Sequence, residues 1–143
     1  MIIYLDTSAL VKVYIQETGS KEVTILLSSS PLTGTSHLSK AEMSAALAMA
    51  VRVNYFTLGL ATEAWQKFLS DWQTLFKLSV SEIIIDKAAS LAWGHGLRGY
   101  DAVHLATALV WQEAIGETVT LATFDRQLKG AGERAGLSVW PVN

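Results

Sequence analysis

Four acidic residues occupy positions where apolar residues surround them, whereas the other acids fall at expected helix ends or on polar faces; the four are Asp6, Glu42, Asp101 and Asp125. An ionised carboxylate among apolar residues is costly unless it is hydrogen-bonded, paired with a cation or bound to a metal. These four side chains are therefore the candidates for chemistry.

Glu42 lies in the middle of a helix that the sequence predicts over residues 38–53, so it cannot be a helix cap. Residues 38, 42, 45, 46, 49 and 53 share one side of that helix, and the five besides Glu42 are apolar. We interpret this side as the core-facing stripe, which would bury Glu42. The alternative is a rotated stripe that leaves Glu42 at the solvated border of the helix.

Asp6, Asp101 and Asp125 each lie close to the start of a predicted helix. Any one of them alone is explained as a cap or first-turn residue that the helix dipole favours. Asp6 and Asp125, however, each follow an apolar strand, and parallel strands end at the same edge of a sheet. Carboxylates that gather there repel one another unless protons are shared or cations are bound. All-oxygen ligation selects hard ions such as Mg²⁺ or Mn²⁺.

Predicted strands and helices alternate along the chain. Strands are expected at residues 1–5, 31–36, 76–80, 119–124 and 137–140, and helices at 7–15, 21–28, 38–53, 58–75, 82–95, 100–113 and 126–134. This alternation predicts a single domain over residues 1–143, built as a three-layer α/β/α sandwich with a parallel central sheet.

Composition excludes several classes of function. The chain has no cysteine, which excludes disulfides, thiolate catalysis and cysteine-bound zinc. The net charge of −2 argues against broad electrostatic coating of nucleic acid. No basic segment precedes the first apolar run, and no run approaches the roughly 20 apolar residues that span a bilayer. We therefore expect a cytoplasmic protein with no membrane association.

Four segments, in order along the chain, resemble the PIN-domain family and, within it, VapC-type toxins of bacterial toxin–antitoxin pairs. They are residues 4–12 (YLDTSALVK), 41–47 (AEMSAAL), 95–108 (HGLRGYDAVHLATA) and 122–128 (ATFDRQL). Each is short, but together they extend from the first strand to the last helix.

The resemblance implies an endoribonuclease that depends on Mg²⁺ or Mn²⁺. It implies that Asp6, Glu42, Asp101 and Asp125 hold the metal, and that Ser8 and Thr123 support the site by hydrogen bonding. Metal-activated water would attack phosphorus in line, leaving a 5′-phosphate and a 3′-hydroxyl. The expected partners are RNA, a cognate antitoxin of VapB type and a second copy of the chain in a homodimer.

Basic residues flank the expected acidic edge, namely Arg98, Arg126 and Lys129. They are candidates for contacts with RNA phosphates, with ordinary solvated charges as the alternative. His104 lies one helical turn after Asp101, and we interpret it as a core or rim histidine rather than a base or a metal ligand.

Two other functions remain as alternatives. A non-catalytic PIN-like module would keep the fold as a binding scaffold. A haloacid-dehalogenase-like phosphatase also begins with a strand that ends in aspartate, but it needs a second aspartate two positions later, where this chain has Ser8.

Overall fold

The computed structural model describes residues 1–142, and within them five strands form one parallel sheet. In chain order the strands are β1 (Ile2–Leu5), β2 (Leu32–Ser36), β3 (Phe76–Leu78), β4 (Val119–Ala122) and β5 (Ser138–Trp140). Their order across the sheet is β3-β2-β1-β4-β5, and every pairing is parallel. The predicted α/β/α fold with a parallel central sheet is confirmed.

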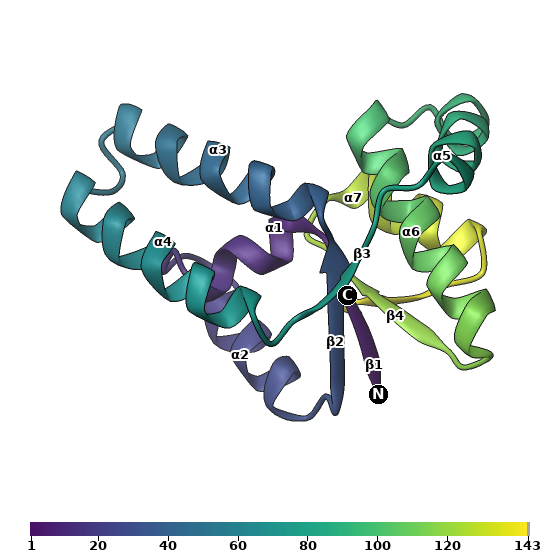
Figure 1. Cartoon of the computed structure of the whole chain (residues 1–143), viewed down its shortest axis with the longest axis horizontal. Helices are drawn as coiled ribbons and strands as arrows, with labels where there is room; N and C mark the ends of the chain where they lie inside the picture. Colours follow the sequence, from purple (N-terminus) through teal and green to yellow (C-terminus); the bar gives the residue numbers. More distant parts are fainter. Residues whose placement is uncertain (143) are drawn as a thin grey trace.

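Helices cover both faces of the sheet (Figure 1). In chain order they are α1 (Thr7–Leu10) with the 3₁₀ helix η1 (Val11–Val13), α2 (Ser20–Ser28), α3 (Leu38–Arg52), α4 (Leu58–Trp72), α5 (Glu82–His95), α6 (Gly99–Ile115) and α7 (Arg126–Arg134). Alternate residues of β1 show which helices cover each face: Ile3 and Leu5 belong to a core cluster with α1 to α4, whereas Tyr4 belongs to a cluster with α5 to α7. The strand that carries Asp6 is therefore buried on both sides.

Several element ends differ from the predicted ones. The first helix becomes 3₁₀ after Leu10, where β-branched Val11 and Val13 lower helix propensity. The third strand ends at Leu78, because its partner β2 ends opposite it at Ser36 and the chain then enters α3. Ser81 caps α5 by accepting a hydrogen bond from the Ile84 amide, which agrees with the predicted start of this helix at residue 82.

The predicted core stripe of the third helix is wrong. The side of α3 that is buried consists of Ser39, Met43, Leu47 and Ala50, whereas Met49 and Val53 are 52% and 62% exposed. Alanines lie on the exposed side of the helix (Ala41, Ala45 and Ala48) and also on the buried side (Ala50), so the sequence gives little contrast between a stripe through Glu42 and one through Met43. Glu42 lies at the border of the buried side, as the alternative interpretation expected.

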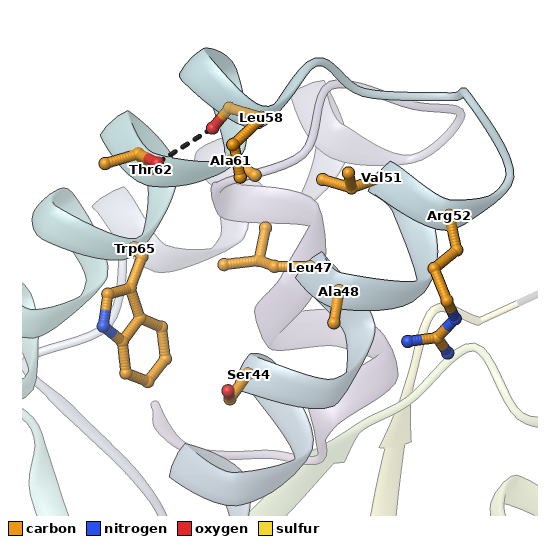
Figure 2. A pocket seen from close by; sticks show the side chains of 9 residues that line it. All are labelled: Ser44, Leu47, Ala48, Val51, Arg52, Leu58, Ala61, Thr62 and Trp65. Carbon is orange, nitrogen blue, oxygen red and sulfur yellow. Dashed lines mark hydrogen bonds between the residues drawn. The ribbon is translucent and has the colours of Figure 1, made fainter.

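Beyond the sheet, α3 and α4 form a helical hairpin (Figure 1), and a groove lies between these two helices (Figure 2). The groove has a volume of about 410 Å³ and is mainly apolar; it is lined by Ser44, Leu47, Ala48, Val51, Arg52, Leu58, Ala61, Thr62 and Trp65. None of the four candidate carboxylates lines it. Over residues 1–142, each helix is too short or too polar to traverse a bilayer.

We predict that Gly34→Ala destabilises the fold, because Trp111 of α6 crosses β2 at this glycine and stacks on Phe76. A Cβ at Gly34 would lie 2.8 Å from the Trp111 ring, and overpacking of this kind costs about 1–3 kcal/mol. A Cβ at Gly59 would instead meet the Thr57 hydroxyl at 3.9 Å, so Gly59→Ala is the matched control and should be neutral or stabilising by up to about 1 kcal/mol. Urea unfolding measures both variants, and equal stabilities would contradict the packing at Gly34.

Candidate active site

The site is built where β1 and β4 end side by side. Leu5 pairs with Ala122, so the next residues, Asp6 and Thr123, leave the sheet together. The Asp6 amide donates to the Ala122 carbonyl at 3.2 Å, and the Thr123 hydroxyl donates to Asp6 Oδ2 at 2.9 Å. The expectation that the strands before Asp6 and Asp125 end at one edge is confirmed.

The Asp6 carboxylate is 4% exposed and accepts hydrogen bonds from several donors. Oδ1 accepts from the Ser8 hydroxyl at 2.7 Å and from the Ala9 amide at 3.2 Å, and the second of these bonds caps α1. Burial raises the pKa of Asp6 above its ordinary value, although electrostatic attraction from His104 and the donors from Ser8, Thr123 and Ala9 oppose the shift. The site therefore holds a carboxyl group whose negative charge is incompletely compensated.

Ser8 and Thr123 also join the two loops that follow β1 and β4. The Ser8 hydroxyl accepts from the Phe124 amide at 2.9 Å, and the Thr123 hydroxyl accepts from the Asp125 amide at 3.1 Å. Both candidate supporting residues thus contact Asp6, and both fix the backbone that leads to Asp125.

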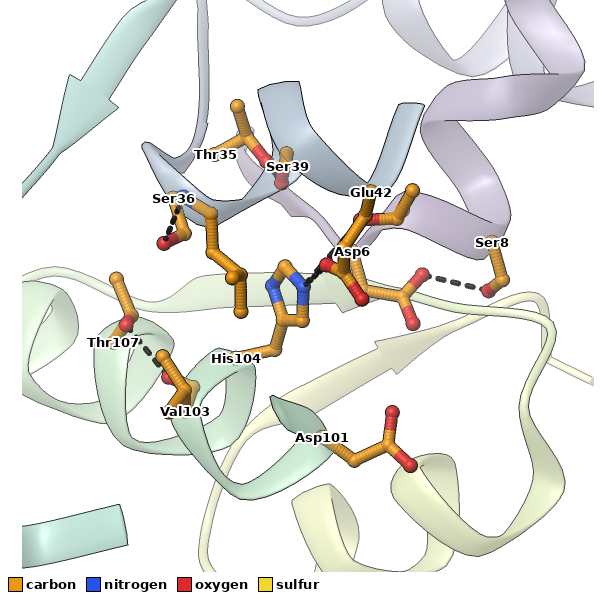
Figure 3. A network of polar contacts seen from close by, with 12 residues as sticks. Asp6, Ser8, Thr35, Ser36, Ser39, Glu42, Asp101, Val103, His104 and Thr107 are labelled. Atoms are coloured by element: carbon orange, nitrogen blue, oxygen red, sulfur yellow. Dashed lines mark hydrogen bonds and ion pairs between the residues drawn. The ribbon is translucent and has the colours of Figure 1, made fainter. Parts of the chain in front are cut away.

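Glu42 reaches the same edge from α3 (Figure 3). Its Oε1 atom accepts a hydrogen bond from the Thr7 hydroxyl at 2.7 Å and lies 2.6 Å from His104 Nε2. The side chain is 23% exposed. Burial opposes its ionisation, but His104, Thr7 and the charge of Arg98 outweigh burial and leave the pKa of Glu42 below its ordinary value.

His104 is the functional neighbour that the sequence analysis missed. It is 1% exposed, so its interpretation as a core histidine agrees with its burial. Besides Glu42, it contacts Tyr4, whose hydroxyl lies 2.7 Å from His104 Nδ1. Burial, reinforced by the Asp6 charge, raises the pKa of Tyr4 well above its ordinary value, so the phenol keeps its proton. The signal in the sequence was the position of His104 one turn after Asp101, on the same helix.

Asp101 and Asp125 share one cation, the guanidinium group of Arg98. Arg98 Nε donates to Asp101 Oδ2 at 2.9 Å, and Nη2 donates to Asp125 Oδ2 at 3.2 Å. Burial raises the pKa of Asp101, opposed by the Arg98 hydrogen bond and charge. Asp125 also caps α7 by accepting from the Leu128 amide at 2.9 Å. The capping interpretation therefore holds for Asp125 as it does for Asp6, whereas Asp101 lies in the first turn of α6.

The other two candidate basic residues lie on α7, beside Thr123. Arg126 and Lys129 line a pocket of about 580 Å³ together with Thr123, Phe124, Gly130, Glu133 and Pro141. This pocket adjoins the carboxylate edge through Thr123. Arg98, by contrast, lies at the edge itself.

The donor set has the chemistry of a site for a hard divalent cation, since it offers carboxylate oxygens and no sulfur. Across residues 1–142, no three histidine, aspartate or glutamate side chains converge tightly enough to hold one ion. Protein donors hold each carboxylate instead: Ser8 and Thr123 at Asp6, Thr7 and His104 at Glu42, and Arg98 at both Asp101 and Asp125. The raised pKa values of Asp6 and Asp101 indicate negative charge that a bound cation would compensate.

Comparison with known proteins places this arrangement in context. The PIN domain family matches residues 3–133. Two curated relatives are Ribonuclease VapC45 and Ribonuclease VapC49, from Mycobacterium tuberculosis strains CDC 1551 / Oshkosh and ATCC 25618 / H37Rv, respectively. Each is 35% identical to this chain over 145 residues, covering 99% of this chain and 96% of the relative.

Solved structures share the fold. FitAcB from Neisseria gonorrhoeae superposes with a TM-score of 0.71 at 21% identity, covering 97% of this chain and 96% of that one. A toxin–antitoxin complex from Klebsiella pneumoniae superposes with a TM-score of 0.62 at 19% identity, covering 86% of each chain. With the family match over most of the sequence and two relatives at 35% identity, the chain belongs to the PIN-domain family.

Proposed function

We propose that this protein is an endoribonuclease, the toxin of a toxin–antitoxin pair, and that it cleaves RNA at the edge where β1 and β4 end. The observation that carries the proposal is the arrangement of Asp6, Glu42, Asp101 and Asp125, which reach this edge from separate elements and are all held by protein donors. The two curated relatives, named ribonucleases, support the same activity. Membership of the PIN-domain family argues against the phosphatase alternative.

The proposed cofactor is Mg²⁺ or Mn²⁺, held by Asp6, Glu42, Asp101 and Asp125. When bound, such an ion activates water and stabilises the charge that develops on a phosphodiester. Ser8 and Thr123 keep the Asp6 carboxylate directed to the edge, while Arg98 supplies the positive charge beside Asp101 and Asp125.

RNA is the proposed substrate, and the pocket beside Thr123 is the proposed contact for its backbone. Arg126 and Lys129 line this pocket, and cationic side chains hold phosphates through salt-sensitive contacts. The remaining surface gives no broad basic field, since the net charge is −2. A local basic pocket at an otherwise acidic edge suits the placement of one short segment of RNA.

The proposed protein partners are a cognate antitoxin of VapB type and a second copy of this chain. The solved complex from Klebsiella pneumoniae, a toxin with its antitoxin, supports the first. Exposed apolar side chains on α5 support the second, since Ile83 is 73% and Trp93 is 93% exposed.

We predict that the wild-type protein cleaves RNA with Mg²⁺ or Mn²⁺ and loses this activity in EDTA. Asp6→Asn and Glu42→Gln should each lower kcat by about 100-fold or more, because each removes charge from the proposed metal site. Exposed acids elsewhere supply matched controls, Asp86→Asn on α5 and Glu63→Gln on α4, which should cleave as the wild type does. An inert wild type, or site variants that cleave as fast as the controls, would refute the nuclease proposal.

A second prediction concerns stability. Because the folded-state pKa of Asp6 is raised, the folded protein binds this proton more tightly than the unfolded chain does. The contribution of Asp6 to the unfolding free energy therefore falls as pH rises from about 4, the ordinary aspartate value, through the folded-state pKa. At pH 7 in EDTA, Asp6→Asn should raise Tm by a few degrees, since about 1 kcal/mol shifts Tm by roughly 3–5 °C at this size.

Differential scanning calorimetry measures this effect across pH. The Tm advantage of Asp6→Asn should shrink below about pH 4, where aspartate is protonated in both states. Mn²⁺ should raise the Tm of the wild type more than that of the variant, because binding to the folded state stabilises it. A variant less stable than the wild type at pH 7 would show that the Asp6 carboxylate stabilises the metal-free fold.

A further inference from the structure

We propose that His104 is a positioning residue, which holds the Glu42 carboxylate at the active edge through a hydrogen-bonded chain from Tyr4 to His104 to Glu42. This inference rests on the proposed ribonuclease function and deepens it. It assigns a role to a buried histidine that is neither a proposed metal ligand nor exposed to substrate.

This hydrogen-bonded chain connects the elements that carry or lead to three of the four carboxylates. Tyr4 lies on β1 two residues before Asp6, and His104 lies on α6 three residues after Asp101. Their contact is 2.7 Å from the Tyr4 hydroxyl to His104 Nδ1, and the rings meet edge to face at 5.8 Å. The His104 Nε2 atom then lies 2.6 Å from Glu42 Oε1, on α3 (Figure 3). The position of Glu42 is thus tied to β1 and α6.

The hydrogen-bond roles along this chain follow from its two ends. Glu42 is a carboxylate and can only accept, so the His104 nitrogen 2.6 Å from its Oε1 atom, Nε2, is assigned a proton and donates. Nδ1 is then assigned as the acceptor for the hydroxyl group of the completely buried Tyr4, 2.7 Å away. The Thr7 hydroxyl donates to the same oxygen at 2.7 Å, so the carboxylate accepts from both groups. A hydroxyl group at Nδ1 and a carboxylate at Nε2 therefore favour the same arrangement, in which His104 is a donor toward Glu42.

Glu42 needs such a partner because of its place on α3. It lies at the border of the buried side, and its side chain is 23% exposed. A glutamate has three rotatable side-chain bonds, so at a solvated border it samples many directions unless a fixed group holds it. His104 is fixed, since it is 1% exposed and bonded at both nitrogens. Groups of this kind, which orient metal ligands from behind, typically change metal affinity or activity by about 10–100-fold when removed.

Two amide substitutions at His104 distinguish the contact with Glu42 from the contact with Tyr4. The side-chain nitrogen of glutamine reaches about as far as Nε2 of histidine, whereas asparagine reaches only as far as Nδ1. His104→Gln should therefore keep the donor to Glu42, and His104→Asn should lose it while keeping a polar group near Tyr4. Both place a neutral amide at the same buried position, so each controls for the other. Tyr4→Phe removes one oxygen and leaves the ring packing intact.

The readouts are the Mn²⁺ dissociation constant of the metal-free protein, kcat and KM for RNA, and Tm. His104→Asn should weaken Mn²⁺ binding and lower kcat by about 10–100-fold, with KM changed less than about threefold. His104→Gln should stay within about fivefold of the wild type in both the Mn²⁺ dissociation constant and kcat. A purely structural role predicts that both variants lose function in step with Tm. Equal losses in the two variants, or no loss in His104→Asn, would overturn the proposal.

Nitrogen-15 NMR of the wild-type imidazole gives a test that needs neither metal nor RNA. We expect the neutral Nε2–H tautomer for His104, and Tyr4→Phe should lower the population of that tautomer. A dominant Nδ1–H tautomer in the wild type would overturn the proposal even if both His104 variants fail to fold. Failure of the ribonuclease proposal is distinguishable, because it appears as a wild type that cuts no RNA while the tautomer and the Mn²⁺ affinities remain measurable.

Discussion

The parallel pairing of β1 with β4 determines the geometry of the whole site. Its register, Leu5 opposite Ala122, sends Asp6 and Thr123 out of the sheet as neighbours and lets the Thr123 hydroxyl reach Asp6 Oδ2. A slip of one residue would direct Asp6 to the opposite face of the sheet. Burial of β1 on both faces makes such a slip costly, because Tyr4 fills one core cluster while Ile3 and Leu5 fill the other. The packing of the core thus fixes the position of the first carboxylate.

The site gathers negative charge that the protein compensates from within. Ser8, Thr123 and backbone amides hold Asp6, a buried histidine and Thr7 hold Glu42, and one guanidinium pairs with both Asp101 and Asp125. Compensation is incomplete, because burial still raises the pKa of Asp6 and of Asp101. Incompletely compensated charge costs stability in the metal-free protein, and the same charge would favour binding of the proposed divalent cation.

The layers of the fold and the shared edge of Asp6 and Asp125 could be predicted from the sequence, because apolar strand segments alternate clearly with helical segments along the chain. Prediction from the sequence failed on α3, where alanines on both the exposed and the buried side hide the buried face and Glu42 was assigned to the wrong stripe. It also missed the contact of His104 with Glu42, which joins residues 62 positions apart and leaves no local pattern. The ion pairs of Arg98 were missed for the same reason, since a basic residue near acids reads equally well as an RNA contact or a solvated charge.

The carboxylate edge is proposed to bind a divalent cation. Diffraction from crystals soaked in Mn²⁺, recorded at the manganese absorption edge, locates the ion directly. We expect an anomalous peak bordered by Asp6 and Asp101 at the end of β1, and no peak there in Asp6→Asn crystals treated alike. A soak at a Mn²⁺ concentration that supports RNA cleavage, with no peak at this edge or a peak only elsewhere on the protein, would contradict it.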